Sequence, residues 1–256
     1  MVYKEVFSGD FMYDFKFDGK YTKTDTENFN VIQGIGKDSG VMQLIMKKPV
    51  PYTIPEGITK LIIHGYIDDS LVTIPKTVKA LEIMSNPVKK LNLTIPMNVK
   101  ELIIAADGAL EVPIDVSKMK NLRSLTYARS PKLKKLGILP DKLEYLTLSN
   151  MGFKTFPKNL PISLVEIRIK RFKNVINFPD LSYLKNLKFI GFEYTAVSKF
   201  SKISPPVKAY LYFLEIPTGS AKFPPNYRDR PESIFITDPY YHVIDGKVVF
   251  IRPTSN

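Results

Sequence analysis

Residues that could carry out catalysis are scarce in this 256-residue chain. It has no cysteine, so it offers no thiol nucleophile, no thiolate zinc ligand and no disulfide framework. Its only two histidines are His64 and His242. His242 has no recognisable partner, and a lone histidine such as His64 is more typical of a surface contact than of a catalyst. We therefore expect a protein that is not an enzyme and that takes no cofactor, metal ion or small-molecule substrate.

Two short motifs resemble ligand sites only superficially. Gly34, Gly36 and Gly40 cluster as in a phosphate-binding loop, but the GK[ST] ending and the strand–loop–helix context are missing, which favours a β-turn. Asp68 and Asp69 are adjacent carboxylates without a metal-ligand pattern, which is typical of a solvated loop. Neither motif predicts a site.

Charge is the more informative chemical feature. Lysine and arginine number 37 and aspartate and glutamate 25, a net charge of +12 that arises entirely after residue 50. Such a surplus favours nucleic acid, anionic lipid or an acidic protein face as partner. The alternative is that the lysines only keep the surface solvated, because no arginine-rich or aromatic-interleaved segment accompanies them. Stacking of the repeats should align several lysines into a basic stripe, with further basic residues near the turn of the stripe. The candidate contacts for an anionic partner are Lys89, Lys90, Lys134, Lys135, Lys170 and Arg171.

An internal repeat predicts the elements that position these residues. An L-x-x-L-x-L pattern recurs, and the middle residue of each copy falls at 61, 81, 102, 125, 146, 167, 190, 210 and 234. A period of 20 to 24 residues leaves little room for a helix in each unit. Each unit should contribute one short strand, stacked in parallel on its neighbours around a shared core. We expect strands centred near 62, 82, 103, 126, 147, 168, 191 and 211.

The repeats resemble known families. Leu139–Pro157, which reads LPDKLEYLTLSNMGFKTFP, is similar to the short leucine-rich repeats of bacterial secreted effectors. The units beginning Ile74-Pro75 and Ile95-Pro96 resemble the IP-rich repeats of amoebae and their giant viruses. The resemblance covers roughly residues 51–237. It implies a leucine-rich-repeat solenoid with a parallel β-sheet on the concave face, a mostly irregular, extended or 3-10 convex side, and recognition of proteins through the concave sheet. The turn asparagine usual in such repeats appears only at Asn86.

The segment before the repeats, residues 1–50, predicts an N-terminal β cap. Apolar residues alternate with others from Phe11 to Phe17, which indicates a half-buried strand, and Val41–Met46 is a second strand candidate. We expect this cap to close the first of eight or nine repeats, which together fill residues 51–237.

The segment after the repeats, residues 238–256, predicts a C-terminal β-hairpin cap. Asp245 and Gly246 stand between two apolar runs, and this dipeptide is a strong signal for a two-residue hairpin turn.

Strand alternation predicts which residues face the concave side. The middle of that surface is small and polar, whereas its C-terminal third is apolar and aromatic, as interaction sites often are. The alternative is that the C-terminal cap folds over this patch. The candidate partner-binding residues are Phe189, Leu211, Phe213, Phe235, Tyr145, Arg168, Ile62 and His64.

The sequence thus favours a non-enzymatic interaction module that binds a protein partner through its concave face. The alternatives are a structural component of a larger assembly such as a virus particle, or a binder of nucleic acid or an anionic surface through the lysine stripe. No run of about 18 apolar residues predicts a membrane span, and the N-terminal residues lack the regions of a signal peptide. We expect the protein in the cytoplasm, in the cytoplasm of an infected host, or inside a virus particle.

Overall fold

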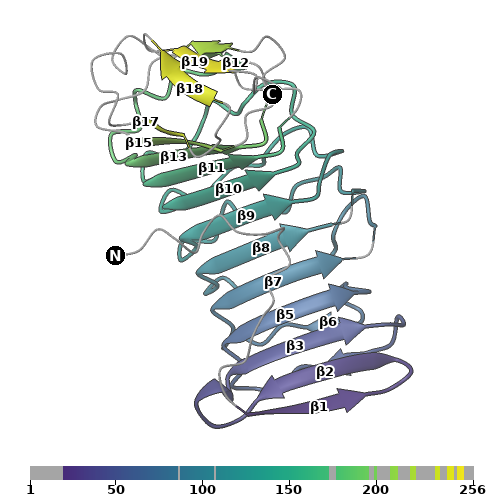
Figure 1. The fold of residues 1–256 in the computed structure, drawn as a ribbon. Coiled ribbons are helices and arrows are strands. Elements are labelled where there is room, and N and C mark those ends of the chain that lie inside the picture. The colour runs from purple at the N-terminus through teal and green to yellow at the C-terminus, as the bar shows by residue number, and fades with distance from the viewer. Residues whose placement is uncertain are drawn as a thin grey trace.

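The chain folds into a solenoid of β-strands stacked side by side (Figure 1). In the described part the secondary structure is strand, apart from one 3-10 turn, η2 (Gly36–Asp38). The computed structural model describes residues 20–85, 87–106, 108–172 and 177–195, and the backbone of strands at 199–200, 208–212, 220–222, 234–236, 241–244 and 247–250.

The main sheet has 12 strands in the order β1-β2-β3-β5-β7-β8-β9-β10-β11-β13-β15-β17. Strands β1 to β3 pair antiparallel, and every pairing from β3 onward is parallel. All eight expected strand centres fall inside strands of this sheet. The bounds are β1 Tyr21–Asp25, β2 Phe29–Gly34, β3 Val41–Met46, β5 Lys60–Gly65, β7 Ala80–Ser85, β8 Glu101–Ala105, β9 Ser124–Ala128, β10 Tyr145–Ser149, β11 Glu166–Lys170, β13 Phe189–Glu193, β15 Lys208–Tyr212 and β17 Ile234–Ile236.

The core lies behind this sheet and is built from two apolar ladders. The second and fourth residues of strands β3 to β13 pair with their counterparts on the next strand, and each is at most 2% exposed. Apolar residues recur at the same two places in each repeat, so stacking the strands in parallel aligns them into two continuous buried rows. The ladders are Met42, Leu61, Leu81, Leu102, Leu125, Leu146, Ile167 and Ile190, and Leu44, Ile63, Ile83, Ile104, Tyr127, Leu148, Ile169 and Phe192.

Proline starts the turn that leads into several strands. The carbonyl of Pro75 accepts a hydrogen bond from the Val78 N–H at 3.1 Å, and the same turn recurs at Pro96, Pro140 and Pro161. Proline is tolerated at this first position because the turn uses its carbonyl as an acceptor and needs no N–H there, which proline lacks.

Two repeats are longer than the others before β13, those from Leu102 to Leu125 and from Ile167 to Ile190. In both, two consecutive turns stand in place of the proline turn. In the first, the Met119 N–H donates to Val116 and the Leu122 N–H donates to Met119, each to the carbonyl at 3.0 Å. The Asp115 carboxylate begins the double turn by accepting from the Ser117 N–H at 3.0 Å. Asp180 repeats the device before β13 by accepting from the Ser182 N–H at 2.8 Å. The extra turn accounts for the longer spacing.

Side chains three places before a strand connect neighbouring repeats. The Asn121 amide donates to the Met97 carbonyl at 3.3 Å, and the Asn186 amide donates to the Ile162 carbonyl at 3.1 Å. Asn98 and Ser163 do the same at equivalent places. The asparagine that usually follows the strand in such repeats was expected only at Asn86, which lies outside the described residues. In this chain the connecting polar side chains precede the strand.

Residues with a left-handed backbone conformation lie at or directly after the ends of several strands, at equivalent places of their repeats. The residue five places after the strand start has positive φ in five repeats: Gly65 (96°), Arg129 (49°), Asn150 (51°), Arg171 (55°) and Tyr194 (49°). The turn keeps backbone hydrogen bonds to the next repeat, as from the Asn150 N–H to Lys170 at 2.9 Å and from the Arg171 N–H to Glu193 at 2.8 Å. Only one of these five residues is glycine, so the others hold a conformation that costs an L-residue about 1–2 kcal/mol.

Two further sheets in the described part of the chain consist of strands of two to four residues. β4 (Tyr52–Thr53) pairs with β6 (Val72–Thr73), and a second sheet has the order β12 (Asn177–Phe178), β14 (Lys199–Phe200), β16 (Ser220–Lys222), β19 (Lys247–Phe250), β18 (Tyr241–Ile244). β18 and β19 pair antiparallel on either side of Asp245-Gly246, as expected, although that dipeptide lies outside the described residues. β19 pairs with β16, so the hairpin extends the second sheet and not the main one.

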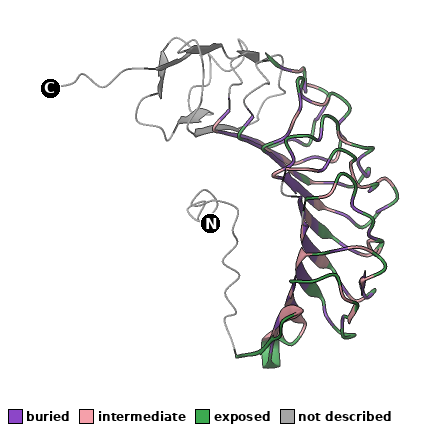
Figure 2. Cartoon of the chain, turned by 90° about the vertical axis from the view of Figure 1, so that its right-hand side faces the viewer, coloured by how far each residue is buried: buried purple, intermediate pink, exposed green. Residues whose placement is uncertain are grey.

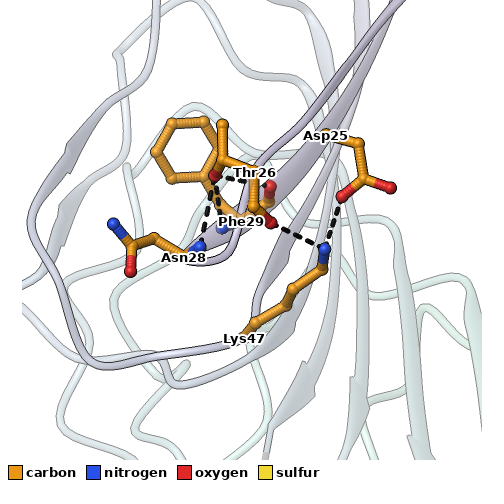
Figure 3. A network of polar contacts seen from close by, with 5 residues as sticks. All are labelled: Asp25, Thr26, Asn28, Phe29 and Lys47. Atoms are coloured by element: carbon orange, nitrogen blue, oxygen red, sulfur yellow. Dashed lines mark hydrogen bonds and ion pairs between the residues drawn. The ribbon is translucent and has the colours of Figure 1, made fainter.

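At the N-terminal end, β3 occupies the expected strand Val41–Met46, while Phe11–Phe17 lies outside the described residues. The turn between β1 and β2 is held by polar contacts, shown in Figure 3. The Lys47 ammonium pairs with Asp25 and donates to the Thr26 carbonyl at 2.8 Å, and the Thr26 hydroxyl accepts from the Phe29 N–H at 3.1 Å. The hydrogen bond from Lys47 lowers the pKa of Asp25. That the N-terminal segment, residues 1–50, functions as a cap remains a prediction.

Candidate functional site

The main sheet lines the inner side of an arc, and the connecting segments form the outer side (Figure 2). We define the concave face as the first, third and fifth residues of β3, β5, β7, β8, β9, β10, β11 and β13, which alternate with the core ladders. The strand register places these residues in three rows across the sheet. The third-residue row, for example, runs Gln43, Ile62, Glu82, Ile103, Thr126, Thr147, Arg168 and Gly191.

Three predicted partner-binding residues lie together near the C-terminal end of this face. Tyr145, Glu166 and Phe189 are neighbours in the first-residue row, and Tyr145 is 43% exposed. The Arg168 guanidinium pairs with Glu166, and its central carbon lies 5.8 Å from the centre of the Phe189 ring. This stacking and pairing hold the cluster in one arrangement before any partner binds.

Ile62 and His64 lie on the same face at its other end, on β5. Ile62 is a predicted partner-binding residue, but it is only 3% exposed and so offers a partner little surface in this structure. It lies outside the main core cluster, in the concave row between Gln43 and Glu82. Neighbouring concave side chains on a tightly spaced parallel sheet cover one another. His64 is half-buried.

Lys170 does not belong to the lysine stripe. As the fifth residue of β11 it lies on the concave face, where its ammonium is 2.7 Å from Glu193 Oε2 on β13. Lys170 is 8% exposed and Glu193 9% exposed. A lysine that is buried and paired with a carboxylate is a poor open contact for an anionic partner. Arg171, the next residue, is exposed and its guanidinium carbon lies 5.9 Å from the centre of the Tyr194 ring.

The four other lysines of the stripe are exposed as expected, but they do not form an unbroken line. The Lys89 carbonyl accepts a hydrogen bond from the N–H of Glu111 at 2.9 Å, which brings an exposed acidic residue beside the first pair. Lys134 and Lys135 instead line a groove of about 950 Å³ together with Lys158. Apolar residues of that groove include Val112, Leu136 and Ile138.

The last predicted concave residues are only partly described. In β15, Leu211 pairs with core residue Phe192 and Tyr210 pairs with Gly191 of the concave face. This register is one residue away from the expected one, which had Tyr210 in the core and Leu211 on the concave face. In β17, Phe235 pairs with Tyr210, which places Phe235 in the concave row, as expected. Phe213 lies outside the described residues.

A second region of the concave face was missed as a site. A pocket of about 130 Å³ near its N-terminal end is lined by Lys60, Ile62, Ala80, Glu82, Glu101 and Ile103, with Leu61 and Leu81. The Glu82 side chain is 8% exposed, and this burial raises the pKa of its carboxyl while Lys60 partly opposes the shift. The sequence signal is an acid placed between Ile62 and Ile103 in one row across three strands, which becomes visible only once the register is known.

The adjacent carboxylates Asp68 and Asp69 serve the loop itself. Asp69 accepts from the N–H and the hydroxyl of Thr94 at 2.6 and 2.7 Å. Asp68 accepts from the N–H and hydroxyl of Ser70, and these hydrogen bonds lower the pKa of its carboxyl. Both carboxylates therefore organise turns between repeats.

No protein-family model matches the chain, and no curated protein matches it in sequence. Within the described residues, no three His, Asp or Glu side chains gather as ligands for a metal ion. The same part of the chain has no helix that is long and apolar enough to cross a membrane.

Proposed function

We propose that this chain is a recognition module of the leucine-rich-repeat type that binds a protein partner through its concave face. The observation that carries the proposal is the cluster of Tyr145, Arg168 and Phe189 on three adjacent strands. Aromatic and arginine side chains supply most hot spots in protein interfaces. Because the strands and the Glu166 pair already hold these side chains, binding loses little side-chain entropy.

The charge of the concave face supports a protein rather than a nucleic acid as the partner. Its charged side chains in the eight strands that define it are three cationic and four acidic: Lys60, Arg168 and Lys170, and Glu82, Glu101, Glu166 and Glu193. The surplus of +12 in the whole chain therefore arises elsewhere. A face that is balanced in charge cannot supply the phosphate neutralisation that dominates binding of nucleic acid.

Site-specific photo-crosslinking in the native source tests the proposal. A benzophenone amino acid at Thr147, in the middle of the concave face, should crosslink to a discrete protein, whereas the same group at exposed Thr73 on β6, outside the main sheet, should not. Crosslinking from Thr73 alone would contradict the proposal. Tyr145→Ala should weaken capture of the crosslinked partner by about tenfold or more, with folding unchanged. Tyr66→Ala, which removes another exposed tyrosine, is the matched control.

The lysine-lined groove favours a second candidate function, the binding of an anionic partner on the opposite side. Lys134, Lys135 and Lys158 line the groove with apolar residues and one acid, Asp141, so an acidic segment with apolar side chains fits its chemistry. Changing Lys134, Lys135 and Lys158 to glutamate should abolish retention on heparin and leave folding intact, because exposed charges contribute little to stability. Changing Lys89 and Lys90, which do not line the groove, is the matched control. Unchanged retention of the groove variant would assign the groove lysines to solubility alone.

A further inference from the structure

The four carboxylates of the concave face differ in how they are satisfied. Glu166 pairs with Arg168, and Glu193 pairs with Lys170, so both have a cationic partner within the chain. Glu101 is exposed to water. Glu82 is 8% exposed, and no hydrogen bond or ion pair to it is present in the described part of the chain. Its carboxylate oxygens are not among the fully buried unpartnered atoms, so they reach the pocket, where burial still raises the cost of a charge that has no cationic partner.

Glu82 lines an open pocket and is not sealed inside the core. The pocket of about 130 Å³ has room for roughly four water molecules, at about 30 Å³ each. Ile62 and Ile103 lie on either side of Glu82 in the same row and form apolar walls. Lys60 acts on Glu82 electrostatically, but the two groups form no ion pair, and Lys60 is exposed.

We propose that Glu82 anchors an arginine side chain of the protein partner in this pocket. An incoming guanidinium supplies the missing charge and up to two parallel hydrogen bonds to the carboxylate. Guanidinium is more weakly hydrated than ammonium and tolerates apolar surroundings, so the walls of Ile62 and Ile103 favour arginine over lysine. The inference rests on the proposed binding of a protein to the concave face, and it adds a second anchor point at the end opposite Tyr145 and Phe189.

The test uses N-acetylargininamide as the probe and the full chain. Side-chain carboxyl resonances of the glutamates are followed by NMR as a function of pH, with and without the probe. Binding of the cation to the ionised carboxylate should move the titration midpoint of Glu82 to lower pH, by about 0.3 pH unit when the probe concentration equals its dissociation constant. N-acetylcitrullinamide, a neutral molecule of the same shape, should cause no such shift, and sodium chloride at equal ionic strength corrects for screening.

Glu101 and Glu82→Gln provide the controls. The midpoint of Glu101, on the rim of the same pocket, should move less than that of Glu82. In Glu82→Gln, probe-induced shifts of the backbone amides around the pocket should disappear, whereas Glu101→Gln should retain them. Equal shifts for Glu82 with the arginine and citrulline probes, or probe-induced amide shifts that persist in Glu82→Gln, would overturn the inference.

These outcomes separate the pocket from the wider function. If Thr147 fails to crosslink to a protein but the arginine probe still moves the midpoint of Glu82, the cation pocket exists and the protein-binding function is wrong. If Thr147 crosslinks while the midpoint of Glu82 does not move, the concave face binds a protein without an arginine at Glu82.

Discussion

A glycine can be required for two reasons: a positive φ that strains other residues, or a lack of space for a Cβ atom. Three glycines of this chain allow the two reasons to be tested separately. Gly57 has φ +87° and open space where a Cβ would stand. Gly152 has ordinary φ, but its Cβ would lie 2.0 Å from the Pro131 carbonyl oxygen. Gly65 combines both, with φ +96° and a Cβ position 2.1 Å from the Met46 carbonyl oxygen. Replacing each by alanine therefore tests the strand-end geometry on which the whole stack depends.

The expected losses of stability follow from these distances. Gly57→Ala incurs the left-handed strain of about 1–2 kcal/mol, less about 0.4–1 kcal/mol gained from a stiffer unfolded chain. Gly152→Ala forces the backbones of neighbouring repeats apart, at about 1–3 kcal/mol. Gly65→Ala carries both costs, less the same gain from a stiffer unfolded chain, so it should lose about 1–4.6 kcal/mol and be the least stable of the three.

Urea unfolding followed by circular dichroism and by tyrosine fluorescence measures these differences, and coincident transitions justify a two-state treatment. The informative quantity is the order of the three free energies of unfolding. If Gly65→Ala and Gly57→Ala lose the same stability within about 0.5 kcal/mol, the close approach between Gly65 and the Met46 carbonyl is absent and the reasoning fails.

Three further predictions concern single side chains. Leu146→Ala should lower the free energy of unfolding by about 2–5 kcal/mol, because it leaves a cavity in a shared core ladder; a loss below about 1 kcal/mol in a urea melt would contradict that packing. Lys170→Met should cost about 3–5 kcal/mol by leaving Glu193 charged and buried, and adding Glu193→Leu should restore most of it in the same melts. Glu82→Gln should stabilise the protein at neutral pH, because burial raises the pKa of Glu82 above its ordinary value of 4.5 and the folded state resists ionisation. The advantage of Glu82→Gln over the parent should be fully present above the raised folded-state pKa and should shrink as the pH falls from neutral toward 4.5; thermal melts that show a constant difference between neutral pH and pH 4.5 would refute it.

The stacking of strands could be predicted because one period repeats through the chain. Each leucine or isoleucine of the pattern has a counterpart in the next unit, so the strands β5 to β13 and their buried faces follow from spacing alone. The register of β15 did not follow, because Tyr210 and Tyr212 alternate with Ala209 and Leu211 and either set can be read as the apolar face. The pairing resolves this by aligning Ala209 with Ile190.

The candidate site was less predictable because its properties depend on contacts across strands. Alternation places Lys170 and Ile62 on the concave face, but only the neighbouring strands decide that Lys170 meets Glu193 and that Ile62 is covered. Tyr145 was easier to predict as an exposed contact, because its neighbours in the row, Ser124 and Glu166, cannot cover a ring of that size.

The hydrogen bonds between the strands of the main sheet run along the length of the stack, since each strand lies across it (Figure 1). Tension applied to the two ends would therefore peel the strands apart, breaking the hydrogen bonds of one inter-repeat interface after another. It would not shear all strands at once. Each released unit of 21 residues, such as Leu81 to Leu102, would lengthen the chain by about 70 Å. A stack built this way yields in steps under force, and single-molecule pulling would record it as an extensible tether rather than a stiff rod.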